Sequence, residues 1–241
     1  REAMESLAPL LERALSDLQK ELNGAKFPLR NMLHSIIAET YWNYYQSNRW
    51  KFMERSVTVN FKVEDIATWD LTHLVDQVFK HHKAALENTD SLKRTPVGHF
   101  EAVLYNYDQN GRKLRPTLYD FLAHRALDFY INKEADITKP ALTYELISED
   151  LFRPSDEFPR FKLENTDSLS RKFYAMRLFQ DLLAFHASDT TPEQRVDVDL
   201  KRLAFVRDHH TSEFRDSLYL EALYDLEKRV YKYPSSTEVT Y

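Results

Sequence analysis

The stretch GRKLRPTLYDFLAHRALDFY, residues 111–130, contains the most plainly encoded helix start in the chain. Thr117 follows Pro116 and precedes Asp120 by three residues. At this spacing the threonine hydroxyl can accept a hydrogen bond from an exposed backbone N–H group, while the carboxylate complements the helix N-terminus. We therefore predict a helix that starts at Thr117. Its apolar residues recur every three or four positions and form one stripe, consisting of Leu118, Phe121, Leu122, Ala126, Phe129 and Tyr130.

Other segments offer apolar faces that can cover this stripe. Helical spacing predicts further helices over residues 3–22, 28–45, 70–88, 168–186, 192–209 and 212–232, and a short one over 98–105. The connection at 23–27 is short, so the first two helices should form an antiparallel hairpin. Asn23-Gly24 predicts the end of the first helix, with Gly24 in the left-handed conformation. Thr191-Pro192-Glu193-Gln194 combines a capping box with proline at the first helical position.

Three segments do not follow helical spacing. Residues 57–61, VTVNF, alternate with period two and predict one short β element near 57–61. Residues 106–112 are polar and end in Asn-Gly, which predicts a loop. Residues 131–166 contain several prolines together with apolar residues, so we expect an irregular strap held against the helices.

The composition favours helices and limits the function classes. The chain has 241 residues, 43% of them hydrophobic, and only 3 glycines, too few for a fold rich in phosphate loops. A net charge of −5 with mixed signs offers no footprint for nucleic acid, and the absence of cysteine excludes disulfides and thiolate chemistry. No apolar run is long enough to span a membrane, so we expect no direct membrane insertion.

Candidate binding residues fall into an aromatic group and a basic group. The aromatic group, Tyr41, Trp42, Tyr45 and Trp50, could bind a peptide or sugar, although helical spacing also explains it as core. The basic group, Arg112, Lys113 and Arg115, could contact an anion or nucleic acid, although three charges near a loop of an acidic protein usually mark a solvated turn. We predict these residues as partner-binding: Tyr41, Trp42, Tyr45, Trp50, Arg112 and Arg115.

Chemistry-bearing patterns are otherwise missing from the sequence. His81-His82 and His209-His210 are adjacent pairs, whose rings diverge on a helix, so ordinary histidines are favoured over a zinc site. No nucleophile elbow, Walker loop or His-Glu-x-x-His arrangement is present. We therefore expect no catalytic residues, no metal and no cofactor.

Four segments resemble a known family. The residues that carry the resemblance are RPTLYDFLAHRALDFY at 115–130, IAETYWNYYQSNRWKF at 37–52, WDLTHLVDQVFKHHKAALENTDSL at 69–92 and SLSRKFYAMRLFQDLLAFH at 168–186. They resemble the N-terminal helical region of alpha-2-macroglobulin family proteins of Bacteroides and its relatives, labelled large extracellular alpha-helical protein. The resemblance covers nearly the whole chain in the same order. The family's thioester needs a cysteine in a far C-terminal domain, so no thioester role falls on any residue here.

The resemblance implies a fold and a role. The helical region looks like a tetratricopeptide-type array, because Ala222, Leu226 and Pro234 match the spacing of such a repeat's second helix, whereas Arg229 and the missing 34-residue period depart from it. We expect an all-α fold of stacked helical hairpins, a degenerate tetratricopeptide-like solenoid, forming a single domain over 1–241 with a subdivision near 106–116.

The expected function is a non-catalytic scaffold or interaction module of a large cell-envelope protease inhibitor. Its expected partners are the remainder of its own polypeptide, and proteases or envelope proteins, with no nucleic acid. We expect the chain to be excised from a longer protein, with any signal or anchor segment outside it. The alternative is a stand-alone peptide-binding helical repeat protein. The two hypotheses are distinguished by whether the parent gene continues into β-rich macroglobulin repeats.

Overall fold

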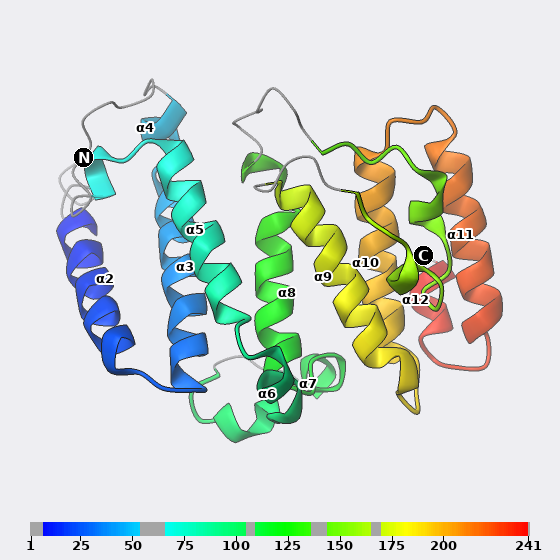
Figure 1. Cartoon of the computed structure of the whole chain (residues 1–241), viewed down its shortest axis with the longest axis horizontal. Helices are drawn as coiled ribbons and strands as arrows, with labels where there is room; N and C mark the ends of the chain where they lie inside the picture. The colour runs from blue at the N-terminus through cyan, green and yellow to red at the C-terminus, as the bar shows by residue number, and fades with distance from the viewer. Residues whose placement is uncertain (1–6, 54–65, 105–108, 136–143, 165–169, 241) are drawn as a thin grey trace. The chain divides into compact units, whose positions relative to one another are not determined.

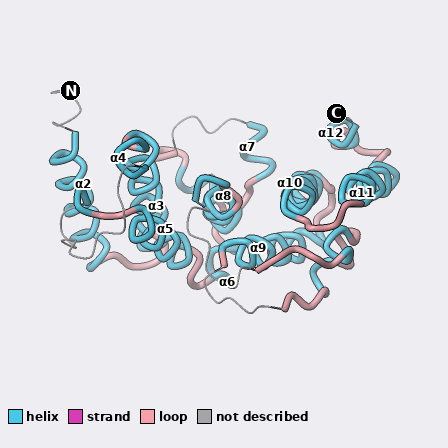
Figure 2. Tube along the Cα trace, turned by 90° about the horizontal axis from the view of Figure 1, so that it is seen from above, coloured by secondary structure: helices cyan, strands magenta, loops and turns pink. Residues whose placement is uncertain are grey.

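The computed structural model describes residues 7–53, 66–104, 109–135, 144–164 and 170–240. These residues form eleven α-helices and several short 3₁₀ helices (Figure 1). No strand occurs among them, as Figure 2 makes visible, and the only extended pairings in these ranges are two isolated bridges. The prediction of an all-α fold is confirmed. The β element predicted near 57–61 lies outside the described residues.

The chain divides into two compact units. The first unit comprises residues 1–94 and 124–138, and the second comprises residues 95–123 and 139–241. The division between residues 123 and 124 falls within α8 (Leu118–Tyr130), whose first residues belong to the second unit. The expected single domain and the subdivision near 106–116 stay predictions.

The first unit is built on a helical hairpin and a third long helix beside it. Its helices are α2 (Leu7–Gly24), α3 (Leu29–Ser47), α4 (Arg49–Met53), α5 (Leu71–Ala85), α6 (Thr89–Arg94) and the part of α8 from residue 124 onward. Helix α5 starts where predicted, because the Asp70 side chain accepts a 2.8 Å hydrogen bond from the His73 backbone N–H group. Helices α3 and α5 pack together over most of their length, and residues such as Ile37, Leu74 and Val78 are completely buried between them and their neighbours.

The second unit places one long helix between two others. Its helices are α7 (Gln109–Leu114), the start of α8, α9 (Arg171–Phe185), α10 (Glu193–His209), α11 (Arg215–Val230) and α12 (Ser236–Thr240). Helix α10 packs against α9 on one side and against α11 on the other (Figure 1). The connections at 186–192 and 210–214 are short, so consecutive helices form antiparallel hairpins. This arrangement confirms the helical hairpins expected for this part of the chain.

One predicted loop is helical. Residues 109–114 form α7 although Gly111 lies inside it, and a glycine in a helix interior costs about 1 kcal/mol relative to alanine. Contacts with α10 offset this cost. Nε2 of Gln194 donates to the Lys113 carbonyl oxygen at 2.7 Å, and Arg115 forms a 2.7 Å ion pair with Asp197. Tertiary contacts therefore override the local loop signal.

Three predicted boundaries are also wrong in detail. Gly24 ends α2 as expected, but it does not adopt a positive φ angle. Pro192 itself occupies the N-cap position of α10, so Thr191 lies one residue before the cap and makes no capping hydrogen bond. The short helix predicted over 98–105 is a 3₁₀ helix, Val97–Phe100, followed by a turn.

Candidate functional site

An extended strap lies on the helices of the second unit. The described part of this strap spans residues 144–164 and contains the 3₁₀ helices Glu149–Phe152 and Phe158–Arg160, which contact α9, α10 and α11. The side chains of Leu146, Leu151 and Phe158 are almost completely buried. The backbone N–H of Thr211 also donates to the Leu146 carbonyl oxygen at 3.1 Å. The helices thus hold a segment that has little regular secondary structure of its own.

The side chain of Gln180, on α9, binds main-chain atoms of the strap. Nε2 of Gln180 donates to the carbonyl oxygens of Phe158 at 3.0 Å and Phe161 at 2.7 Å, while the side chain is only 3% exposed. A buried carbonyl without a partner would destabilise the fold by about 1–3 kcal/mol. One buried amide therefore satisfies two carbonyl groups of the strap.

Arg202 on α10 binds the strap in the same way. Its Nη1 and Nη2 atoms donate to the carbonyl oxygens of Leu151 and Arg153 at 2.5 and 2.9 Å, and its Nε donates to Oδ1 of Asp199 at 2.7 Å. The guanidinium also lies 4.4 Å over the Phe158 ring. Arg202 is completely buried, and such a charge is tolerated only when its hydrogen bonds are satisfied.

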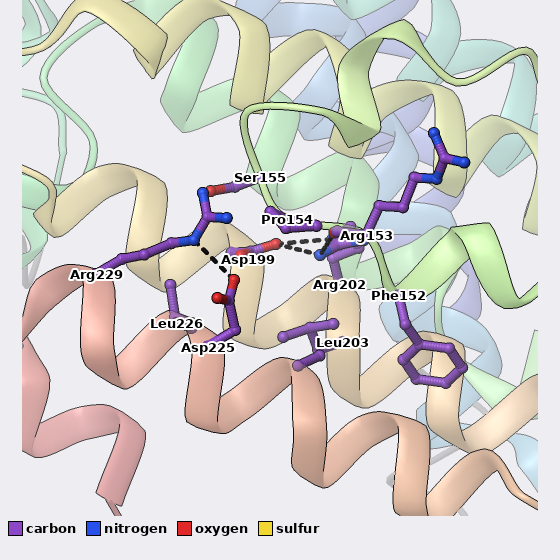
Figure 3. Close-up of a pocket in the computed structure, with 11 residues that line it drawn as sticks. Phe152, Arg153, Pro154, Ser155, Asp199, Arg202, Leu203, Asp225, Leu226 and Arg229 are labelled. Carbon is purple, nitrogen blue, oxygen red and sulfur yellow. Dashed lines mark hydrogen bonds and ion pairs between the residues drawn. The ribbon is translucent and has the colours of Figure 1, made fainter.

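Asp199 is the counter-charge of this buried guanidinium. Burial raises the pKa of Asp199, and the positive charge of Arg202 opposes that rise. The Arg202 contacts join Asp199 and the strap main chain in one hydrogen-bonded network (Figure 3). The network fixes the strap across α10.

A pocket of about 190 Å³ opens between the strap, α10 and α11. Its lining residues come from the second unit only and are Phe152, Arg153, Pro154, Ser155, Asp199, Arg202, Leu203, Ala222, Asp225, Leu226 and Arg229. The α11 residues recur at three- and four-residue spacing and so share one helical face (Figure 3).

The second unit also contains a buried cluster at the start of α8. Oδ2 of Asp120 accepts from the Thr117 backbone N–H at 3.0 Å and from its hydroxyl at 2.8 Å, while the Asp120 N–H donates to Thr117 Oγ1 at 3.2 Å. This reciprocal pattern confirms the predicted helix start. Oδ1 of Asp120 faces Nε2 of His186 at 2.8 Å, and Nδ1 of His186 faces Asp189 at 2.6 Å.

This cluster ties elements together and offers no free base. Both ring nitrogens of His186 face carboxylate oxygens, and the Thr117 hydroxyl proton points to Asp120. A general base must have a nitrogen that can take a proton from its substrate. In this geometry neither nitrogen of His186 is available for that purpose.

His34, His81 and His82 are among the buried histidines of the first unit. Nδ1 of His34 and Nδ1 of His81 lie 3.0 Å apart, and the His82 ring stacks on Phe129 with centroids 5.4 Å apart. Burial, followed by the charges of His34 and Lys80, lowers the pKa of His81 to about 4. Burial and the charge of Arg125 lower the pKa of His82 to about 3. These rings are therefore neutral at pH 7.

The predicted aromatic group is mostly core. Tyr41, Trp42 and Tyr45 are 3%, 9% and 2% exposed, and Trp42 packs edge-on against Phe129. Only Trp50 is exposed, at 52%. The four residues therefore do not form an open binding surface, and helical spacing was the better guide to them.

The predicted basic group belongs to the second unit and is ion-paired. Arg112 pairs with Glu101, and Arg115 pairs with Asp197. Only the Arg112 side chain is substantially exposed. The structure brings neither arginine to the pocket, and the structure places Trp50 in the other unit.

The sequence analysis did not predict the residues that hold the strap. Val196, Asp199, Leu203 and Val206 follow three- and four-residue spacing, so a carboxylate at 199 interrupts an apolar stripe. Arg202, three residues after Asp199, is a matching charge. This pattern is the signal from which the buried ion pair could have been expected.

Within the described residues, no group of three potential metal ligands lies close enough together to hold a metal ion. None of the described helices is both long and apolar enough to cross a membrane. Comparisons of the chain with family models, with curated proteins and with solved structures found no match.

Proposed function

We propose that this chain is a non-catalytic helical module that holds protein segments, within a large cell-envelope protease inhibitor of the alpha-2-macroglobulin type. The observation that carries the proposal is the way α9 and α10 hold the strap. Gln180 and Arg202 bind four main-chain carbonyl oxygens of one extended segment. Main-chain contacts of this kind do not depend on which side chains the bound segment carries.

The family resemblance supports the remaining part of the proposal. It assigns the chain to the helical region that precedes the macroglobulin domains, and it implies a location in the cell envelope. The all-α fold and the helical hairpins agree with a scaffold role. Proteases or envelope proteins would be the partners, together with the rest of the same polypeptide.

A reading-frame test followed by a deletion tests this proposal. We expect the parent gene to encode β-rich macroglobulin repeats after Tyr241. Deletion of residues 1–241 from that parent should leave bait cleavage by a protease intact, while recovery of its envelope partners in a pull-down falls. If the deleted and complete proteins recover the same partners, the module does not bind them.

The second candidate is a stand-alone peptide-binding helical repeat protein. The open pocket beside the strap favours it, because the strap leaves part of the groove between α10 and α11 unfilled. A reading frame without macroglobulin repeats would select this candidate over the first.

A further inference from the structure

Helix α11 buries one face and exposes the other. Leu226 and Val230 are 5% and 2% exposed, and α10 packs beside α11 within the second unit (Figure 1). Leu220, Tyr224 and Tyr231 are 52%, 61% and 66% exposed, and Tyr231 is the C-cap residue with helical backbone angles. Spacings of four and seven residues place these three side chains on one face. Single exposed apolar residues are normal, but a stripe along about three helical turns is typical of an interaction surface.

Two charged side chains flank this stripe on the same side. Glu221 and Lys228 are both exposed and lie seven residues apart, which is about two helical turns. The ion pairs that α11 forms with described residues involve Asp216, Asp225 and Arg229, and neither Glu221 nor Lys228 takes part in one. The stripe therefore has a carboxylate beside its first half and an ammonium group beside its second half.

This order of charges is complementary to itself in an antiparallel helix pair. When Leu220 of one helix lies opposite Tyr231 of an identical antiparallel helix, the knobs-into-holes register brings Glu221 of each helix close to Lys228 of the other. A parallel pair would instead bring Glu221 close to Asp216 of the other helix, and these two carboxylates repel each other. The charges on α11 therefore select an identical helix that runs in the opposite direction.

We propose that the exposed face of α11 binds α11 of a second copy of this chain, so that the protein forms a two-fold symmetric dimer. A two-fold axis makes every contact occur twice, so the dimer contains two Glu221–Lys228 ion pairs. The same register places Tyr224 of each copy opposite Glu227 of the other, where the tyrosine hydroxyl can donate to the carboxylate. One helix from each copy makes a small interface, so the dimer should be weak, with a dissociation constant on the order of 10 μM. This inference goes beyond the proposed function and does not depend on it.

Sedimentation equilibrium of the complete chain tests this dimer. Loading concentrations of about 1–100 μM bracket the expected dissociation constant, and the mass should rise from that of one copy towards that of two. Leu220→Glu removes an apolar contact and places a carboxylate against the ring of Tyr231, twice in each dimer. This variant should raise the dissociation constant by more than about tenfold.

Charge reversals test the antiparallel register. Glu221→Lys and Lys228→Glu should each weaken the dimer several-fold, because each brings like charges together twice. The double variant Glu221→Lys/Lys228→Glu restores opposite charges and should recover most of the natural affinity. Glu145→Lys is the matched control, because Glu145 is exposed in the second unit and lies outside α11. Unchanged thermal midpoints by circular dichroism would show that the variants fold.

Three outcomes overturn the inference. They are the mass of one copy at every concentration, a dimer that Leu220→Glu leaves unchanged, and a dimer that Glu145→Lys weakens as much as Glu221→Lys does. A double charge variant that binds no tighter than the single variants would overturn the antiparallel register. None of these outcomes bears on the recovery of envelope partners or on the parent reading frame, so failure here and failure of the proposed function can be told apart.

Discussion

Nε2 of His186 lies 2.8 Å from Oδ1 of Asp120, and both side chains are at most 2% exposed. The second ring nitrogen of His186 lies 2.6 Å from Oδ2 of Asp189. An ionised carboxylate can only accept hydrogen bonds, so a ring with carboxylates at both nitrogens must donate from both. With both carboxylates ionised, this geometry favours the imidazolium form of His186. This buried cation joins the start of α8 to the residues that follow α9 within the second unit.

The charge of His186 makes the second unit sensitive to alkaline pH. Burial alone lowers the pKa of His186, but the hydrogen bonds and charges of Asp120 and Asp189 outweigh it and raise the pKa above 6.5. A raised pKa contributes stability that is fully present below pH 6.5 and is lost as the pH rises through the folded-state pKa. We expect the His186 ring to titrate above pH 6.5 by NMR, and the free energy of unfolding in urea to fall over that range.

His186→Gln checks this prediction. The variant should be less stable than the natural protein by about 3 kcal/mol at pH 6, because two carboxylates lose their buried counter-charge. The difference should shrink as the pH rises through the folded-state pKa of His186, because the natural ring then loses its proton. A difference that is constant with pH would show that His186 does not fold as an imidazolium.

The first unit should respond to acid instead. Burial lowers the pKa values of His34, His81 and His82, to about 4 for His81 and about 3 for His82. Depressed pKa values contribute stability that is present above pH 6.5 and is lost as the pH falls through the folded-state values. All three tryptophans, Trp42, Trp50 and Trp69, precede residue 95, so tryptophan fluorescence reports on this unit. We expect the urea midpoint by fluorescence to fall between pH 6.5 and pH 4.

His82→Phe is the variant for the acid prediction. Phenylalanine preserves stacking on Phe129 and cannot be protonated, so the urea midpoint should depend less on pH below 5 than in the natural protein. His99→Phe is the control, because His99 is exposed. Equal pH dependence in both variants would mean that protonation of His82 does not contribute to the loss of stability in acid.

The helix start at Thr117 should contribute measurable stability. Thr117→Ala removes the hydroxyl that accepts from the Asp120 N–H and donates to its carboxylate, at a cost of about 1 kcal/mol in the free energy of unfolding. Thr191→Ala is a matched control. Thr191 has the same local sequence signal but makes no capping bond to α10, so its replacement should cost less than about 0.5 kcal/mol. Urea unfolding followed by circular dichroism measures both values.

Local sequence patterns account for the helices and their starts. Thr117 and Asp120 are three residues apart, so their capping contact depends only on neighbouring residues. The partner of Asp120 is His186, which lies 66 residues further along the chain, and no local pattern marks such a pairing. The helix at 109–114 could not be predicted for a similar reason. It is stabilised by contacts with α10, which lies far away in the sequence, rather than by its own residues.

The candidate site was harder to predict than the fold for a related reason. Composition suggested aromatic and basic residues as binding groups, but Tyr41 and Tyr45 are core and Arg115 is ion-paired. The residues that line the pocket, such as Asp199 and Ala222, come from different helices and meet only through the packing of α10 against α11. Sequence spacing predicted that a strap exists, but it could not predict where the strap lies.

Arg202 should be the most costly single replacement in the second unit. Arg202→Met leaves the Asp199 carboxylate buried without its counter-charge and removes donors from the carbonyl oxygens of Leu151 and Arg153, which should lower the free energy of unfolding by about 3–5 kcal/mol. Adding Asp199→Leu should recover part of that loss, since the unpaired charge is then gone. Arg229→Met provides the contrast, because its exposed pairs should contribute at most about 1 kcal/mol. Equal losses for Arg202→Met and Arg229→Met in urea unfolding would rule out a buried network at the strap.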